Sequence, residues 1–300
     1  MDFGRINSFA QVEYALPADH KSLAKVLGGA KAKDPKLYAG GVMWADEGFK
    51  GLIYPEKAKA ADYVKYYAKQ FNTIELNATH YRIPDADTFK RWYDVAPAGF
   101  KFCPKVNQEI SHAGNLLPML SFHNQCNDLF QLLRDKLGTC FMQLPPQFGT
   151  SRLNELLEFL DHSDLRNLAI ELRHESWYRQ EAELNQLCNY LYKNGMSLII
   201  TDTPGRRDVL HMRLTDKTAM LRFNANNDHP TDRTRMDEWV QRFKTWFDHG
   251  LEELYFFMHS PDQRFMPQLV SYLIRQMQQV CGISIAPPVI RQNTEPETLF

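Results

Sequence analysis

Two pairs of polar residues have a spacing that suits acid–base chemistry. Glu75 and Asn77 are two residues apart, and so are Glu171 and Arg173. In a β-strand this spacing points both side chains of a pair toward the same face. Carboxylates gathered with basic groups in a partly desolvated site shift one another's pKa values and can exchange protons with a substrate. We therefore take Glu75 and Glu171 as the leading general acid and base candidates.

Three basic residues could hold an anion beside these carboxylates. Lys105, Arg173 and Arg222 carry the type of charge that binds a phosphate, a carboxylate or a developing oxyanion. His112 and His174 could transfer a proton in the same site. These residue types indicate a small anionic substrate that contains a phosphate or a sugar.

The other candidates would bind the substrate. Trp44, Tyr81 and Trp177 offer stacking surfaces for a sugar or a base. Further polar groups come from Asn77, Gln143, Asp202 and His259. Each candidate has a structural alternative, because barrels of parallel strands also bury ion pairs between strand ends to satisfy inward-pointing polar groups.

A divalent metal site is an alternative interpretation of the acidic and histidine residues. Oxygen and imidazole ligands could come from Glu75, Glu171, Asp202, His112, His174 and His259. The sequence has no His-x-His or His-Glu-x-x-His motif, so a metal is possible but its ligands are unknown. It also has no Gly-x-Gly-x-x-Gly motif for a nucleotide cofactor and no Gly-x-Ser-x-Gly nucleophile motif.

The candidate residues must be positioned by strands, because they follow short apolar runs. The predicted strands are 37–42, 73–76, 101–106, 139–144, 168–172, 197–201, 219–223 and 254–258. Their starts recur about every 31 residues, which is the length of a βα unit. Eight such units predict a single-domain (β/α)8 TIM barrel, and a doubly wound sheet is the alternative.

Amphipathic segments between the strands predict the helices. They cover 58–70, 86–96, 121–137, 152–161, 181–194, 234–248 and 261–280. Start signals are Asp85 before the second of these and Ser260 before the last. We interpret 1–36 as an N-terminal extension, 37–284 as the barrel domain and 285–300 as an extended C-terminal tail.

Composition limits the partners of the chain. With 300 residues, 44% of them hydrophobic, and a net charge of -1, the protein has no overall attraction to nucleic acid or to a membrane. Residues 206–244 hold nine basic and six acidic side chains, which permits local nucleic-acid binding. The sequence contains no apolar run of about 18 residues and no signal-peptide pattern, so we expect a cytoplasmic protein without membrane contact.

Several motifs, taken in order, resemble the YecE-like TIM barrels, a family defined as a domain of unknown function. They are Glu75-Leu76-Asn77, Lys105 with Ile110-Ser111-His112, Gln143-Leu144-Pro145, and Glu171-Leu172-Arg173-His174 with Trp177. Val42 and His259 depart from the usual family pattern, and the resemblance covers residues 37–290. The resemblance implies a TIM barrel with a polar pocket, distantly similar to the xylose-isomerase-like barrels that include a metal-dependent DNA-repair endonuclease.

The last residues carry a separate hypothesis. Leu299 and Phe300 resemble the end of the short peptides that dock in the bacterial sliding clamp, although Pro296 occupies the expected glutamine position. Clamp binding is therefore the weaker alternative to an apolar tail that folds back onto the barrel.

The sequence thus predicts an enzyme, a hydrolase or an isomerase, that acts on an anionic substrate by general acid–base chemistry at the C-terminal face of the barrel. One alternative is a binding protein for nucleic acid or phosphate that has no chemistry of its own. The other is a metal-dependent hydrolase of the phosphodiesterase or endonuclease type.

Overall fold

The computed structural model describes residue 4 and residues 12–291, and these form an α/β fold with parallel sheets. The strands are β1 (Lys36–Gly40), β2 (Thr73–Leu76), β3 (Lys101–Pro104), β4 (Cys140–Gln143), β5 (Leu168–Glu171), β6 (Ser197–Leu198), β7 (Ile200–Asp202), β8 (Thr218–Asn224) and β9 (Glu253–His259). Every predicted strand is confirmed, and the sixth is divided into β6 and β7 at Ile199.

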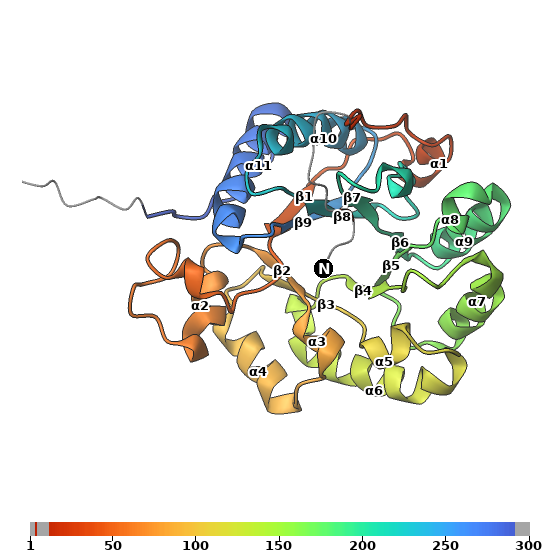
Figure 1. Cartoon of the computed structure of the whole chain (residues 1–300), viewed down its shortest axis with the longest axis horizontal. Helices are drawn as coiled ribbons and strands as arrows, with labels where there is room; N and C mark the ends of the chain where they lie inside the picture. Colours follow the sequence, from red (N-terminus) through yellow and green to blue (C-terminus); the bar gives the residue numbers. More distant parts are fainter. Residues whose placement is uncertain (1–3, 5–11, 292–300) are drawn as a thin grey trace, which may run out of the picture.

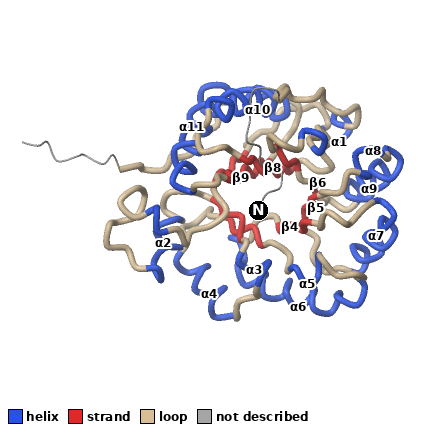
Figure 2. The backbone as a smooth tube through the Cα atoms, in the orientation of Figure 1, coloured by secondary structure: helices blue, strands red, loops and turns tan. Residues whose placement is uncertain are grey.

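Strand pairing defines three parallel sheets. Their orders are β1-β9-β8-β7, β2-β3 and β4-β5-β6. Single backbone contacts lie between them, such as Glu75 N donating to Gly41 O at 3.1 Å and Val106 N donating to Phe141 O at 2.8 Å. The strands lie around a common centre with helices on the outside (Figures 1 and 2). The ladder hydrogen bonds therefore establish parallel sheets, and they do not by themselves describe a closed barrel.

Most of the helices lie between strands along the chain, whereas α1 precedes β1 and α11 follows β9. The α-helices are α1 (Leu23–Leu27), α2 (Tyr63–Tyr67), α3 (Ala78–Tyr81), α4 (Ala86–Val95), α5 (Gln108–Ser111), α6 (Leu120–Phe130), α7 (Leu153–His162), α8 (Ser176–Arg179), α9 (Glu181–Lys193), α10 (Pro230–Asp248) and α11 (Met266–Cys281). The short 3-10 turns are η1 (Glu47–Phe49), η2 (Ala60–Asp62), η3 (Leu117–Met119), η4 (Gln131–Lys136), η5 (Thr150–Arg152), η6 (Arg207–Val209) and η7 (Gln263–Phe265). No helix in residues 12–291 combines the length and the apolar character that crossing a membrane requires.

Three helix starts differ from the prediction. The helix predicted from 58 begins as the 3-10 turn η2 and becomes α-helical only at Tyr63 in α2. Helix α10 begins at Pro230 and not at 234, because His229 and Asp232 form a capping box and Pro230 suits the first turn. Helix α11 begins at Met266 and not at 261, since the chain first forms η7 after Asp262, whose side chain accepts from Arg264 N. The predicted cap of α4 is confirmed, because Asp85 accepts from Thr88 N.

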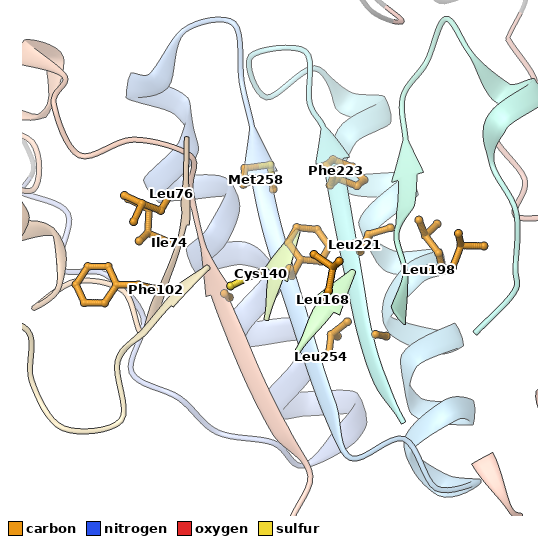
Figure 3. Packing of buried hydrophobic residues seen from close by; sticks show 14 of the residues in the cluster. Ile74, Leu76, Phe102, Cys140, Leu168, Leu198, Leu221, Phe223, Leu254 and Met258 are labelled. Atoms are coloured by element: carbon orange, nitrogen blue, oxygen red, sulfur yellow. The ribbon is translucent and has the colours of Figure 1, made fainter. Parts of the chain in front are cut away.

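The strands separate two apolar clusters by alternating their side chains. One set, which includes Ile74, Phe102, Leu168 and Leu221, packs with the helices in the larger cluster (Figure 3). The alternate residues form a smaller cluster of Tyr38, Cys103, Phe141, Ala169, Ile199, Met220, Tyr255 and Phe257. Two positions further along the same strands stand Lys105, Gln143, Glu171, Thr201, Arg222 and His259. The period of two therefore places these polar residues on the same face as the smaller cluster, beyond it toward the strand ends.

Candidate functional site

A cavity of about 580 Å³ lies at the carboxyl ends of several strands. Seven of the predicted site residues line it, namely Trp44, Glu75, Asn77, Tyr81, Arg173, Arg222 and His259. They lie in or shortly after the strands β1, β2, β5, β8 and β9, so residues that are far apart in the sequence meet at one cavity. This position agrees with the usual place of ligand sites in parallel α/β folds.

Arg222 connects the two predicted catalytic carboxylates. Its Nε and Nη2 donate to Oε2 and Oε1 of Glu75, both at 2.9 Å, and its Nη1 donates to Oε2 of Glu171 at 2.5 Å. All three side chains are buried. A paired two-bond contact of this kind fixes the orientation of a carboxylate as well as its charge.

Glu171 has further partners on neighbouring strands. Thr201 Oγ1 donates to its Oε1 at 2.9 Å, and Gln143 Nε2 donates to its Oε2 at 2.5 Å. Arg173 lies 3.4 Å from Oε1. The Glu171 carboxylate is therefore held by groups from β4, β7 and β8 and from the connection after β5.

Lys105 ends this network without a carboxylate partner. Its Nζ donates to Gln143 Oε1 at 3.0 Å, and no acidic side chain of the described residues lies within ion-pair distance of it. Burial, and then the charge of Arg222, lower the pKa of Lys105 to about 8. Lys105, Arg173 and Arg222 are three cations beside the two carboxylates, so these five described side chains together carry one excess positive charge while Lys105 is protonated.

The environment of the two carboxylates favours their ionised forms. Burial of Glu171 would raise its pKa, but the charges of Arg173 and Arg222 outweigh burial and lower the pKa to about 2. Burial is likewise outweighed at Glu75, where Arg222 and His259 lower the pKa well below its usual range. Both groups therefore bind protons weakly, which makes them better suited to holding cations in place than to accepting a proton at neutral pH.

His259 is a histidine of the cavity lining, and it contacts the Glu75 carboxylate. Its Nε2 lies 3.0 Å from Glu75 Oε2, and 22% of its side chain is exposed. Burial lowers the pKa of His259, and the charge of Glu75 opposes that effect. Asn77 Nδ2 donates to the other oxygen of Glu75 at 2.9 Å. Glu75 thus orients an imidazole that faces the cavity.

Seven predicted residues lie outside the cavity lining, among them Glu171 and Asp202. His112 is hydrogen bonded to Ser111, and His174 bonds Ser176 Oγ at 2.8 Å. Trp177 is a wrong prediction as a stacking surface, because it is fully buried and its indole donates to Phe148 O at 2.8 Å. Gln143 and Lys105, although they belong to the Arg222 cluster, are also buried beside the cavity and do not line it.

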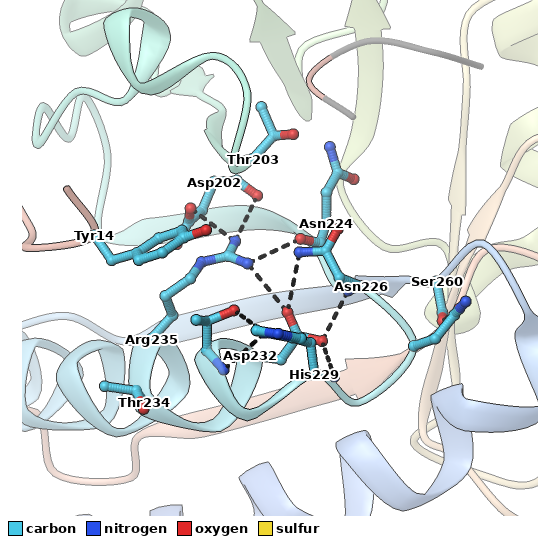
Figure 4. A network of polar contacts seen from close by, with 12 residues as sticks. Tyr14, Asp202, Thr203, Asn224, Asn226, His229, Asp232, Thr234, Arg235 and Ser260 are labelled. Atoms are coloured by element: carbon cyan, nitrogen blue, oxygen red, sulfur yellow. Dashed lines mark hydrogen bonds and ion pairs between the residues drawn. The ribbon is translucent and has the colours of Figure 1, made fainter. Parts of the chain in front are cut away.

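Asp202 belongs to a second polar network, on the helix side of the sheet (Figure 4). It accepts from Arg235 at 2.8 Å and from Trp239 at 2.6 Å, and it pairs with Arg207. Arg235 also pairs with Asp232, so two carboxylates balance two guanidinium groups. Asp202 is one residue beyond Thr201 on the strand and therefore points to the opposite face from the Arg222 cluster.

The possible metal ligands are spread over these separate surroundings. Within residues 12–291 no three histidine, cysteine or acidic side chains gather in a way that could hold a metal ion. Of the six residues predicted as ligands, Glu75 and His259 are in contact, whereas His174 and Asp202 have other partners. The clamp hypothesis falls on Leu299 and Phe300, which lie outside the described residues.

Several lining residues were not predicted from the sequence. They are Met43, Asp46, Thr203, Asn226, Ser260 and Gln263. All but Gln263, which falls in the predicted helix 261–280, stand in the loop that follows a predicted strand, which was the signal available in the sequence. Loop residues lack the period of two that marks the strand residues, so the sequence did not show which of them face the cavity.

Comparison with known proteins relates this site to a family. Residues 38–292 match the family described as "Protein of unknown function DUF72". The UPF0759 protein YecE of Escherichia coli K12 is 28% identical over 254 residues, which cover 76% of this chain and 90% of that protein. The UPF0759 protein YunF of Bacillus subtilis 168 is 27% identical over 205 residues, which cover 64% and 71%.

Solved structures agree with the fold. A DUF72 family protein from Enterococcus faecalis V583 superposes with a TM-score of 0.61 at 19% identity, covering 85% of this chain and 99% of that one. A DUF72 family protein from Thermotoga maritima MSB8 gives 0.57 at 24% identity, covering 81% and 99%. The sequence match and the shared α/β fold agree with the predicted YecE-like resemblance, and the chain belongs to the DUF72 family.

Proposed function

We propose that the cavity binds a small anion that contains a phosphate or a sugar. The observation that supports this proposal is the excess positive charge of the buried cluster, in which Lys105, Arg173 and Arg222 accompany Glu75 and Glu171. Arg173 and Arg222 line the cavity, and a charge in a poorly solvated site attracts an anion more strongly than the same charge in water does. An anion would neutralise the cluster.

The arrangement of the strands is part of the same proposal. We interpret the three sheets as the wall of a single-domain (β/α)8 barrel, with the smaller apolar cluster as its interior. The cavity then opens at the C-terminal face of the barrel, where the loops after the strands supply the ligand contacts.

Proton transfer in this cavity is best assigned to His259. A neutral imidazole that a buried carboxylate holds in place is a common general base, and Glu75 occupies the orienting position. The proposed enzyme would therefore use His259 on the bound anion, with Glu75 and Glu171 ionised throughout. Binding without turnover is the alternative that the same cavity allows.

The contact between His259 and Glu75 can be tested by NMR titration of the histidine side chains. We expect Glu75→Gln to lower the pKa of His259 further, because the neutral amide no longer stabilises the imidazolium while Arg222 still opposes it. His123, which is buried and bonds Ser163 Oγ at 2.8 Å, is the control resonance, and its pKa, lowered by burial, should not change. An unchanged His259 pKa would show that Glu75 does not influence the imidazole in solution.

The proposed anion site can be tested through the pH dependence of binding. We expect ribose 5-phosphate to bind about tenfold more weakly at pH 9.5 than at pH 7, because Lys105, with a pKa of about 8, loses its charge between these values. The phosphate is a dianion over this whole range, so the change reports on the protein. Isothermal titration calorimetry measures both affinities.

Two variants isolate the contribution of Lys105. Lys105→Met should bind the probe weakly at both pH values, whereas Lys101→Met, at the other end of β3, should behave like the parent protein. The proposal fails if the parent protein does not bind ribose 5-phosphate at pH 7. If binding occurs but is independent of pH, Lys105 has no part in it.

A further inference from the structure

We propose that the mouth of the cavity is a subsite for a planar ring, formed by Met43, Trp44, Tyr81 and Gln263. The ligand would then be an anion joined to a ring that carries a hydrogen-bond donor, as in a nucleoside monophosphate. This inference rests on the proposed anion site and names the class of molecule that the site accepts.

Apolar side chains are exposed at this mouth to an unusual degree. Four large hydrophobic residues of the described chain are classed as exposed, and two of them, Met43 at 41% and Tyr81 at 62%, line the cavity. They follow different strands, β1 and β2, so the sequence does not make them neighbours. Exposed apolar groups that meet at a cavity are typical of a ligand-binding surface.

The aromatic residues at the mouth are held firmly on one side. The Trp44 ring packs edge-on against Trp92 with ring centres 5.2 Å apart, and its carbonyl accepts from Tyr54 at 2.9 Å. Tyr81 rests edge-on against His80, also at 5.2 Å, and its hydroxyl has no hydrogen bond to any described residue. Fixed rings with a free face lose little conformational freedom when another ring stacks on them.

Gln263 provides a buried polar group in the lining of the same cavity. Its Nε2 donates to Ser260 O at 2.6 Å, which fixes the orientation of the amide. Its Oε1 is buried and has no hydrogen-bond partner among the described residues. A buried acceptor without a donor is costly, so this atom favours a ligand that brings an N–H or O–H group.

The two ends of the cavity therefore differ in chemistry. Arg173, Arg222 and His259 supply charge, and Met43, Trp44 and Tyr81 supply apolar surface. A cavity of about 580 Å³ has the volume usual for a ligand of nucleotide size. An anion without a ring would leave the apolar mouth in contact with water, and a ring without an anion would leave the charge unneutralised.

Calorimetry with ribose 5-phosphate and the four common nucleoside 5′-monophosphates tests the subsite, because these probes differ by the ring alone. We expect at least one nucleotide to bind about tenfold more tightly than ribose 5-phosphate. Tyr81→Ala should weaken the binding of that nucleotide about tenfold and change the affinity for ribose 5-phosphate less than twofold. Tyr192→Ala, another exposed tyrosine that lies outside the cavity lining, is the matched control and should change neither.

The outcomes separate this inference from the proposed function. If ribose 5-phosphate binds as tightly as every nucleotide and Tyr81→Ala has no effect, the ring subsite is wrong and the anion site stands. If no probe binds to the parent protein, both are wrong. Tight nucleotide binding that Tyr81→Ala reduces selectively supports both.

Discussion

Replacing Arg222 with methionine should lower the free energy of unfolding by about 3–5 kcal/mol at pH 7, because it leaves two buried carboxylates without their shared partner. Methionine keeps much of the side-chain volume, so the loss reports on charge more than on packing. Chemical denaturation followed by circular dichroism measures the change. Arg233→Met is the matched control, since Arg233 pairs with Asp228 at the surface and should contribute less than about 1 kcal/mol.

The effect of this substitution should depend on pH in a defined direction. The pKa of Glu171 is lowered from 4.5 to about 2, so its stabilising contribution is present above pH 4.5 and is lost as the pH falls toward 2. Without Arg222 the pKa values of Glu75 and Glu171 rise. Protonation of these carboxylates therefore lowers the free energy of unfolding of the variant less than that of the parent protein. The difference in the free energy of unfolding between the parent protein and Arg222→Met should therefore be largest near pH 7 and smaller at pH 4.

A compensating variant makes the interpretation specific. Adding Glu75→Gln and Glu171→Gln to Arg222→Met removes the uncompensated charges and should recover part of the lost stability. No recovery, or an equal loss at pH 4 and pH 7, would mean that Arg222 stabilises the fold by packing and not by pairing with the carboxylates.

The period of two in the strands explains how far the sequence could predict this cluster. Alternation predicted that Glu75 and Asn77 share a strand face and that Glu171 and Arg173 do, whereas the smaller apolar cluster beside them is seen only in the structure. Regular recurrence of apolar runs likewise predicted the strands and most of the helices. These features are local, and local spacing is what a single sequence contains.

The same rule accounts for where the structure places other predicted residues. His174 follows Arg173 by one position, so its side chain lies off the shared face and bonds Ser176. Trp177 lies in a short helix, where strand alternation does not apply, and packs into the core. The sequence also could not show that Arg222 joins Glu75 to Glu171, because that contact spans 147 residues on one side and 51 on the other.

Arg173→Ala should weaken the binding of ribose 5-phosphate at least tenfold, because Arg173 is a largely buried cation that lines the cavity. A charge-assisted hydrogen bond from such a group contributes about 1.5–3 kcal/mol to binding. Arg179→Ala is the control from the same connection after β5, because Arg179 is 73% exposed and pairs with Glu175 outside the cavity lining. Calorimetry at pH 7 compares the variants with the parent protein, and thermal unfolding shows whether each is folded. A folded Arg173→Ala variant that binds the probe as tightly as the parent protein would place the anion away from Arg173. Loss of binding in Arg173→Ala, with binding by Arg179→Ala unaffected, would instead place the negative charge of the ligand beside Arg173 in the cavity. The excess positive charge of the buried cluster would attract the ligand to that position.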